Sequence, residues 1–183
     1  MVSTAALLIG TRGVSATSFS EVLEASGAPR GSIYHYFPRG KRQLVEDSLR
    51  WTSEQVLDYQ RRCRSGSPER ILRHFVQFFR RSVVSSDCEA GCPVAAVVIG
   101  AYVDRDELSG AVHESFESWR ALLAEQLAAA GLTPARARSL AVTALASVEG
   151  ALLLCRAQRS VDPLDEVEAE LERLGRGARR PGA

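Results

Sequence analysis

Apolar residues recur at steps of three and four along nearly the whole chain of 183 residues. Between about residues 40 and 64, an otherwise charged stretch carries this spacing in Val45, Leu49, Val56, Tyr59 and Cys63. Such spacing places the apolar side chains on one face of a helix. The alternation of apolar and polar residues that half-buried strands require is essentially absent. The sequence therefore predicts an all-α protein of about nine helices.

Prolines mark the starts of several of these helices. Proline suits the first helical turn, where its missing N–H breaks no hydrogen bond, and a preceding Ser, Thr or Asp can cap that turn. The pattern occurs at Ser67-Pro68, Thr133-Pro134 and Asp162-Pro163, and Cys92-Pro93 is expected to begin a short helix. A first helix is expected over Val2 to Thr11.

The composition is that of an ordinary globular protein, with 45% hydrophobic and 25% charged residues. The four cysteines are too few and too scattered for a disulfide framework, which favours a cytoplasmic location. The longest apolar stretches are Val94 to Val103, which contains Gly100, and Leu140 to Leu154, which contains Glu149. Neither reaches the roughly 18 uninterrupted apolar residues of a membrane span. Both are expected to be buried helices, and no membrane partner is predicted.

The net charge of +1 conceals an asymmetry along the chain. Residues 1–64 hold nine Lys and Arg against six Asp and Glu, so this segment carries +3 and the remainder −2. Every basic residue is arginine except Lys41. The excess of positive charge is modest, but it points to the front segment as the part suited to an anionic partner.

Residues 18–38 carry the pattern of two short helices joined by a tight turn. Ser18 and Glu21 have the spacing of a capping box, and Gly27 supplies the left-handed conformation that ends the first helix. Pro29 fits the first turn of the second helix, and Pro38 ends it. This arrangement is a helix-turn-helix.

The second of these helices has the chemistry of a DNA reader. Ile33 and Phe37 share one face and can anchor the helix. The residues left on or near the other face are Arg30, Gly31, Ser32, Tyr34 and His35. An arginine at the helix start can reach guanine bidentately, and Tyr34, His35, Tyr36 and Lys41 can donate to phosphates. Taken alone, the Tyr-His-Tyr-Phe run fits the corner of a core better than a binding surface, and its combination with the cap, the glycine turn and Arg30 is what favours DNA binding.

The segment from residue 17 to 44, above all Ala28-Pro-Arg-Gly-Ser-Ile-Tyr-His-Tyr-Phe-Pro-Arg-Gly-Lys41, resembles the DNA-binding segment of the TetR family of bacterial transcriptional regulators. Gly91-Cys-Pro-Val-Ala-Ala96 is similar to the LmrA/YxaF-type subgroup. The resemblance implies a homodimer with a DNA-binding domain over residues 1–45, an effector-binding and dimerisation domain over 46–176, and a flexible tail over 177–183. By matching positions, the five outward residues above would face the major groove of operator DNA. Phosphate contacts would come from Thr17, Ser18, Tyr36 and Lys41.

The sequence departs from the family pattern in two places. Leu23 stands where relatives often have alanine, so the second helix would pack more widely. The sequence also begins at Met1 without a basic arm before the first helix, which puts N-terminal phosphate contacts in doubt.

The helix after Pro134 carries a stripe of small and apolar residues, and a second amphipathic helix follows Pro163. From the residues alone, the stripe suits a monomer's core and a helix–helix interface equally well. The resemblance favours a four-helix dimer interface. The predicted interface residues are Leu140, Ala141, Ala144, Leu145, Val148, Leu152 and Leu171.

The resemblance also implies a small-molecule pocket among the helices after Lys41. Candidate lining residues are Trp51, Phe75, Phe79, Val98, Tyr102, Phe116, Trp119 and Cys155. Taken singly, each of these residues fits a plain core position better than a ligand contact. Together they favour an apolar or aromatic effector, whose binding would release a repressor from its operator.

Other functional classes fit less well. The chain has three histidines, no Gly-rich phosphate loop and no nucleophile elbow, so neither an enzyme nor a cofactor or metal site is predicted. Cys88 and Cys92, four residues apart, leave a redox-responsive repressor as an alternative. A helical interaction protein without DNA binding is the other, and the segment from Arg30 to Lys41 argues against it.

Overall fold

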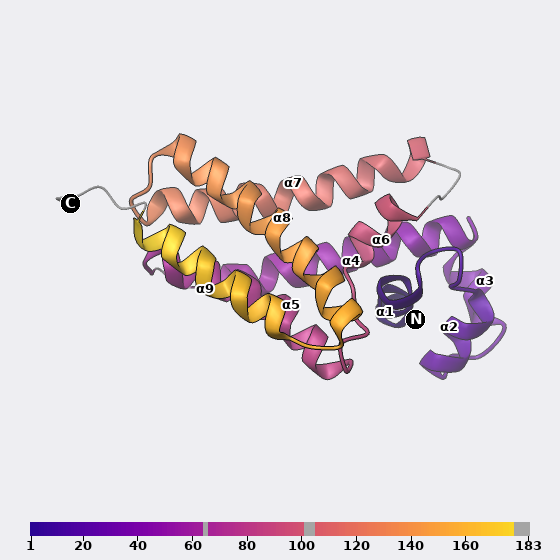
Figure 1. The fold of residues 1–183 in the computed structure, drawn as a ribbon. Coiled ribbons are helices and arrows are strands. Elements are labelled where there is room, and N and C mark those ends of the chain that lie inside the picture. The colour runs from indigo at the N-terminus through magenta and orange to yellow at the C-terminus, as the bar shows by residue number, and fades with distance from the viewer. Residues whose placement is uncertain (64–65, 101–104, 178–183) are drawn as a thin grey trace. The chain divides into compact units, whose positions relative to one another are not determined.

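The computed structural model describes residues 1–63, 66–100 and 105–177, and in this part of the chain every regular element is an α-helix (Figure 1). The helices are α1 (Val2–Arg12), α2 (Phe19–Ser26), α3 (Ser32–Tyr36), α4 (Lys41–Arg61), α5 (Pro68–Ser85), α6 (Pro93–Ile99), α7 (Arg105–Ala129), α8 (Pro134–Gln158) and α9 (Asp162–Gly177). The predicted all-α class is confirmed. Tyr102 and the predicted tail beyond Gly177 lie outside the described residues.

Contacts between residues divide the chain into two compact units. Unit 1 comprises residues 1–55 and 91–116, and unit 2 comprises residues 56–90 and the chain from residue 117 onward. Both α4 and α7 contribute residues to both units. The boundary predicted near residue 45 follows the DNA-binding motif, whereas unit 1 also takes in the first part of α4 and all of α6.

Unit 1 is built on a small apolar core beneath its first helices. Ala5, Val22, Ile33, Phe37 and Leu44 are buried together, one or two from each of the first four helices or their ends. Five further apolar residues, among them Phe19 and Leu23, pack around this core while partly exposed. This shared core holds the segments together, although α1, α2 and α3, with 11, 8 and 5 residues, are each too short to be stable alone.

Helix α1 approaches the segment before α6 unusually closely. A Cβ atom placed on Gly10, which is buried in α1, would lie 2.5 Å from the carbonyl oxygen of Gly91. The obstacle is backbone, which cannot rotate away as a side chain can. Only glycine therefore fits this crossing of α1 and α6.

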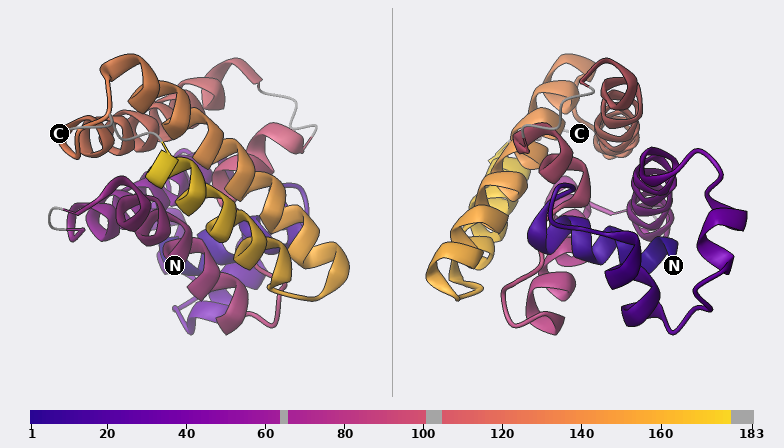
Figure 2. Two further views of the ribbon diagram at one scale, coloured as in Figure 1. Left: turned by 60° about the vertical axis from the view of Figure 1, so that its left-hand side comes forward. Right: turned by 90° about the vertical axis from the view of Figure 1, so that its right-hand side faces the viewer.

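Unit 2 contains the end of α4, the second half of α7 and the helices α5, α8 and α9. In it α5 packs against α9 and α8, and α8 and α9 run side by side (Figure 2). The apolar face of α5 is buried along its length, from Ile71 to Val83. At the start of α5, a Cβ atom placed on Gly175 of α9 would lie 2.8 Å from the backbone nitrogen of Glu69. The end of α9 thus lies directly against the start of α5.

A row of polar pairs joins α5 to α9 along one edge of their contact. Arg73 pairs with Glu172, Gln77 donates a hydrogen bond to Glu168, and Arg80 donates to Asp165 through both Nε and a terminal nitrogen at 2.7 and 3.3 Å. The α5 numbers rise as the α9 numbers fall, so the two helices are antiparallel. The hydrogen bond from Arg73 lowers the pKa of the Glu172 carboxyl, because it favours the ionised form.

The crossing at Gly10 generates a stability prediction. Gly10→Ala should lower the free energy of unfolding by about 1–3 kcal/mol, because the new methyl group overlaps the Gly91 backbone. Gly110→Ala is the matched control: Gly110 lies in α7 of the same unit, with open space where its Cβ would be. This control should gain about 0.5–1 kcal/mol. Urea unfolding followed by circular dichroism measures both, and equal midpoints for the two variants would contradict the close approach.

Candidate nucleic-acid interface

The turn into α2 forms the predicted capping box. The Ser18 hydroxyl accepts a hydrogen bond from the Glu21 backbone N–H at 3.3 Å, and the Glu21 carboxylate accepts one from the Ser18 backbone N–H at 2.8 Å. The latter bond is the main reason that the pKa of Glu21 is lowered. Gly27 ends the helix with φ 67° and ψ 15°, the left-handed conformation predicted for it. Both ends of α2 are therefore fixed by local sequence.

Helix α3 is short and is attached to unit 1 through its apolar face. Ile33 and Phe37 are both buried, as predicted. The Pro29 carbonyl accepts hydrogen bonds from the Ser32 backbone N–H and hydroxyl, at 2.9 and 2.6 Å, which closes the first turn. The apolar anchors and this turn set the orientation of the opposite face.

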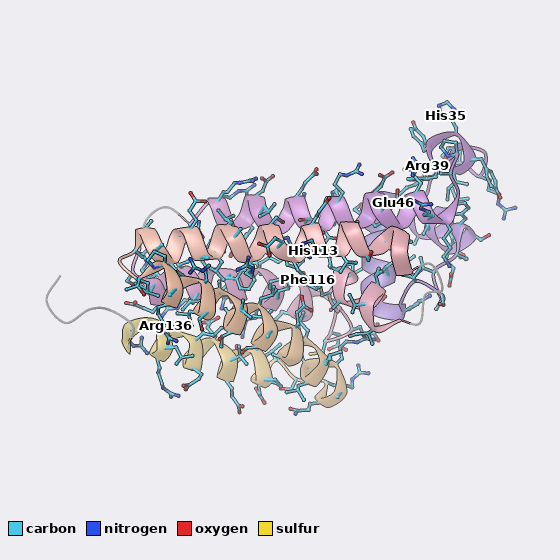
Figure 3. The ribbon with its side chains drawn as sticks, turned by 90° about the horizontal axis from the view of Figure 1, so that it is seen from above. His35, Arg39, Glu46, His113, Phe116 and Arg136 are labelled. Atoms are coloured by element: carbon cyan, nitrogen blue, oxygen red, sulfur yellow. The ribbon has the colours of Figure 1, made fainter. Side chains whose placement is uncertain are left out.

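The opposite face of α3 is open to solvent. Tyr34 is 71% exposed and Tyr36 60% exposed. His35 lies between them at the outer edge of the unit and points away from it (Figure 3). Arg30 and Gly31 are exposed just before the helix, and the Tyr34 ring packs edge-on against Phe19, with ring centroids 5.9 Å apart. Large polar side chains thus project from the helix that the sequence predicts to read DNA.

Three residues predicted to contact DNA use their hydroxyls within the chain. Thr17 is only 2% exposed, and its hydroxyl donates to the Gly13 carbonyl at 2.9 Å. The Ser32 hydroxyl donates to Pro29 as described above. Both hydroxyls stabilise the backbone around the helix-turn-helix. Ser18 is exposed, but its hydroxyl belongs to the capping box.

Lys41 begins α4 and lies beside the turn that follows α1. Its ammonium donates to the Ser15 carbonyl at 3.4 Å, and partial burial lowers its pKa. Gln43 ties α4 to the end of α3, since its amide donates to the Tyr36 carbonyl at 3.1 Å and its side-chain oxygen accepts from the Arg39 N–H at 3.2 Å. Gln43 was missed in the sequence analysis, because a lone glutamine carries no motif.

The other arginines of this region are held by carboxylates. Arg39 and Arg42 each lie 2.9 Å from an oxygen of Glu46, and Figure 3 shows Arg39 and Glu46 next to one another. Arg12 pairs with Glu21 at 3.3 Å. Within the described part of the chain, Arg30 takes part in no recorded ion pair. The N–H donors of its guanidinium are therefore not occupied by a carboxylate in the described structure.

Comparison with known proteins identifies the family of this chain. Residues 2–47 match the family described as bacterial regulatory proteins, tetR family, and residues 68–170 match the C-terminal domain of LmrA/YxaF-like transcriptional regulators. The chain belongs to the TetR family. It is a transcriptional regulator, not an enzyme, and its family binds operator DNA.

Relatives of this TetR-family chain match it over nearly their whole length. The uncharacterised HTH-type regulator Rv0196 of Mycobacterium tuberculosis is 40% identical over 179 residues, covering 95% of this chain and 91% of the relative. The HTH-type regulator LmrA of Bacillus subtilis is 26% identical, covering 90% and 88%. A TetR regulator from Legionella pneumophila, of known crystal structure, has the same fold, with a TM-score of 0.84 at 21% identity over 94% of this chain and 93% of that one.

The residues predicted to line an effector pocket are divided between the two units. Phe75, Phe79, Trp119 and Cys155 are buried in unit 2, where Phe79 packs against both Phe75 and Trp119 at centroid distances of 5.4 and 6.1 Å. Trp51 and Val98 are exposed residues of unit 1, and Phe116 is half-buried there. Phe75, Phe79 and Trp119 thus form an aromatic cluster within unit 2, and their role in ligand binding stays a prediction.

The stripe predicted as a dimer interface packs inside the chain itself. Six of its seven residues are buried in unit 2 without any second subunit, and the seventh, Leu145, is half-buried. Since α8 packs against α9 and α5, these residues form the core between those helices. Their burial is accounted for by the core of a single chain, the first of the two interpretations that the sequence left open. The large apolar residues that α8 leaves exposed are Val142, Leu153 and Leu154.

The cysteines of the redox alternative differ in their surroundings. Cys92 is buried and Cys88 half-buried, and the four cysteines form no disulfide in the structure described. Burial raises the pKa of the Cys155 thiol, and the nearby Cys88 contributes to this shift. A redox role for Cys88 and Cys92 stays a prediction.

The capping box generates a stability prediction. Ser18→Ala should lower the free energy of unfolding by about 1 kcal/mol, because the Glu21 amide loses its acceptor. Ser20→Ala, an exposed position in the first turn of the same helix, is the control and should change stability little. Urea unfolding of both variants provides the measurement. If Ser18→Ala costs no more than Ser20→Ala, the box does not stabilise α2.

Proposed function

We propose that this TetR-family chain acts as a homodimeric repressor that leaves its operator when a small apolar or aromatic ligand binds unit 2. The observation that carries the DNA-binding part is the exposed face of α3, with its unpaired Arg30, on a helix anchored by Ile33 and Phe37. A rigid anchor and a solvated polar face are what a recognition helix needs for insertion into a major groove.

Arg30 is the residue proposed to read sequence. An arginine without a carboxylate partner can donate two parallel hydrogen bonds to O6 and N7 of guanine without first breaking an ion pair. Tyr34 and His35 are exposed beside it and are proposed to face the groove. Tyr36 and Lys41 are proposed to hold phosphates, which fixes the register of the helix on DNA but carries no sequence information.

A second copy of the chain is proposed to cover the outer face of α8. Among the described helices, α8 is the one long and apolar enough to cross a bilayer, and 39% of its most apolar 18-residue window is buried inside the chain. A second copy suits the remaining surface better than lipid, because Arg136 and Arg138 project from the first turns of the exposed side. The outward residues Ala135, Ser139, Val142, Ala146, Gly150 and Leu153 follow steps of three and four.

Small residues on this outward face allow close helix packing, and a two-fold axis would place two α3 helices for two half-sites about 34 Å apart, or a multiple of it. The proposed interface therefore differs from the stripe chosen from sequence and uses the opposite side of the same helix. The repressor would leave the operator if the ligand preferentially binds a state in which the spacing of the two recognition helices no longer matches the half-sites. The aromatic cluster of Phe75, Phe79 and Trp119 supports an apolar or aromatic ligand.

DNA binding is tested by gel shift with DNA from upstream of the protein's own gene. The wild-type dimer should bind selectively, with affinity falling as salt rises. Arg30→Ala should cost about 1–3 kcal/mol and relax base preference, whereas Lys41→Ala should weaken all sequences alike and reduce the salt slope by about one. Arg173→Ala, an exposed α9 residue, controls for loss of one charge. The repressor proposal fails if a folded dimer shows no selective binding.

The interface is tested by Leu153→Lys. Two lysines facing each other across the two-fold axis lose apolar burial and repel, so the dimer dissociation constant should rise at least 100-fold. Val84→Lys is the matched control, since Val84 is equally exposed on α5. Sedimentation velocity measures the oligomeric state. A Leu153→Lys protein that remains as dimeric as Val84→Lys would place the interface elsewhere.

A further inference from the structure

A pocket of about 540 Å³ opens at the end of α4 and along the outward face of α5, within unit 2. Its α5 residues recur at steps of three and four, on the side of that helix opposite its buried apolar face. The lining consists of Tyr59, Arg62, Cys63, Arg70, Arg73, His74, Gln77 and Arg81. Four of these eight side chains are guanidinium groups and none is a carboxylate. The pocket shares no residue with the predicted effector site.

The four arginines are not equally available to a ligand. Arg73 is committed to α9, because it pairs with Glu172 at 2.5 Å and lies 4.0 Å from Glu168. Arg62, Arg70 and Arg81 are exposed, and no ion pair is recorded for them in the part of the chain that the structure describes. The positive field of these three side chains, with no carboxylate among the pocket's lining residues, would attract an anion.

The aromatic side of the pocket is rigid. The Tyr59 and His74 rings stack at a centroid distance of 4.2 Å and an interplanar angle of 10°. His74 Nε2 lies 2.8 Å from the Tyr59 carbonyl oxygen, which can only accept, so Nε2 carries the proton. Phe78 packs against Tyr59 at 5.5 Å. Position and tautomer of the imidazole are therefore set before any ligand arrives.

This wall also positions one of the uncommitted arginines. The Arg81 guanidinium carbon lies 4.9 Å from the centroid of the Tyr59 ring, in cation–π distance. On the far side of the pocket, Gln77 donates to Glu168 and so ties the lining to α9, as Arg73 does. A cationic site with a fixed guanidinium and a braced wall loses less entropy on binding than loose surface arginines would.

We infer that this pocket binds a compact multivalent oxyanion, with phosphoryl groups as its best match. Planar guanidinium groups donate paired hydrogen bonds that fit phosphate and carboxylate oxygens, and several of them converge here. The volume accommodates a small molecule. This site is separate from α3 and from the aromatic cluster, so it would give the regulator a second input of opposite chemistry. The inference stands whether or not an apolar effector exists.

Isothermal titration of the full-length protein with sodium pyrophosphate tests the inference. We expect saturable binding of one pyrophosphate per chain that weakens as sodium chloride is raised. Arg62→Gln and Arg70→Gln should each raise the dissociation constant about tenfold or more, because each removes charge-assisted hydrogen bonds. Arg173→Gln loses the same charge on exposed α9 outside the pocket and should bind as wild type. Citrate in place of pyrophosphate separates a carboxylate ligand from a phosphoryl one.

A second readout locates the bound anion. The chain has three histidines, His35, His74 and His113, so their imidazole proton signals are few enough to assign by single substitution. Pyrophosphate should shift the His74 signal and leave the other two unchanged. No saturable binding, equal weakening in Arg173→Gln, or a shift confined to His35 or His113 would each overturn the inference. So would a result in which Arg62→Gln and Arg70→Gln weaken only DNA binding.

Discussion

The burial of Ile33 and Phe37 is the interaction on which the DNA-facing part of this protein depends. Helix α3 has five residues, far fewer than an isolated helix needs to persist in water. Its conformation therefore comes from the core formed with Ala5, Val22 and Leu44, and from the turn closed by Pro29. Because both anchors lie on one face, the other face is obliged to project Tyr34 and His35 into solvent. The same packing that makes the helix stable thus determines what it presents.

Ion pairs decide which arginines remain available for partners. The total charge is close to neutral, yet Arg39 and Arg42 share Glu46, and Arg73 and Arg80 are held by acidic residues of α9. Exposed ion pairs of this kind contribute little to stability, but each one engages the N–H donors of an arginine that could otherwise bind a partner. Among the described residues, the arginines without a recorded ion pair include Arg30 at the start of α3 and Arg62, Arg70 and Arg81 in the pocket on α5. A count of charges along the sequence does not identify these arginines, since it does not say which carboxylate faces which arginine.

Local signals in the sequence were sufficient to predict where helices begin and end, but not which residues of other segments pack against them. The Thr133 cap is formed as predicted, with its hydroxyl accepting from the Arg136 N–H at 3.3 Å, and the Ser18 box and Gly27 turn are likewise present. These features involve residues three or four apart, so sequence spacing specifies them. Thr17 was predicted to contact phosphate, but its burial depends on packing around the turn after α1. The α5 pocket was missed because a polar helix face suggests only a solvated surface.

Helix α8 shows most clearly where sequence periodicity reaches its limit. It is apolar on more than one side, so a stripe at steps of three and four can be drawn along it in more than one way. Periodicity indicates that a stripe of apolar residues is buried, but it does not indicate whether the same chain or a second chain covers that stripe. The stripe containing Ala141, Ala144 and Val148 is covered by the chain's own helices. The face bearing Val142 and Leu153 is what that packing leaves uncovered, and small side chains between these two residues allow another helix to approach it. The intrachain core therefore has to be assigned first, and the candidate interface is the apolar surface that remains.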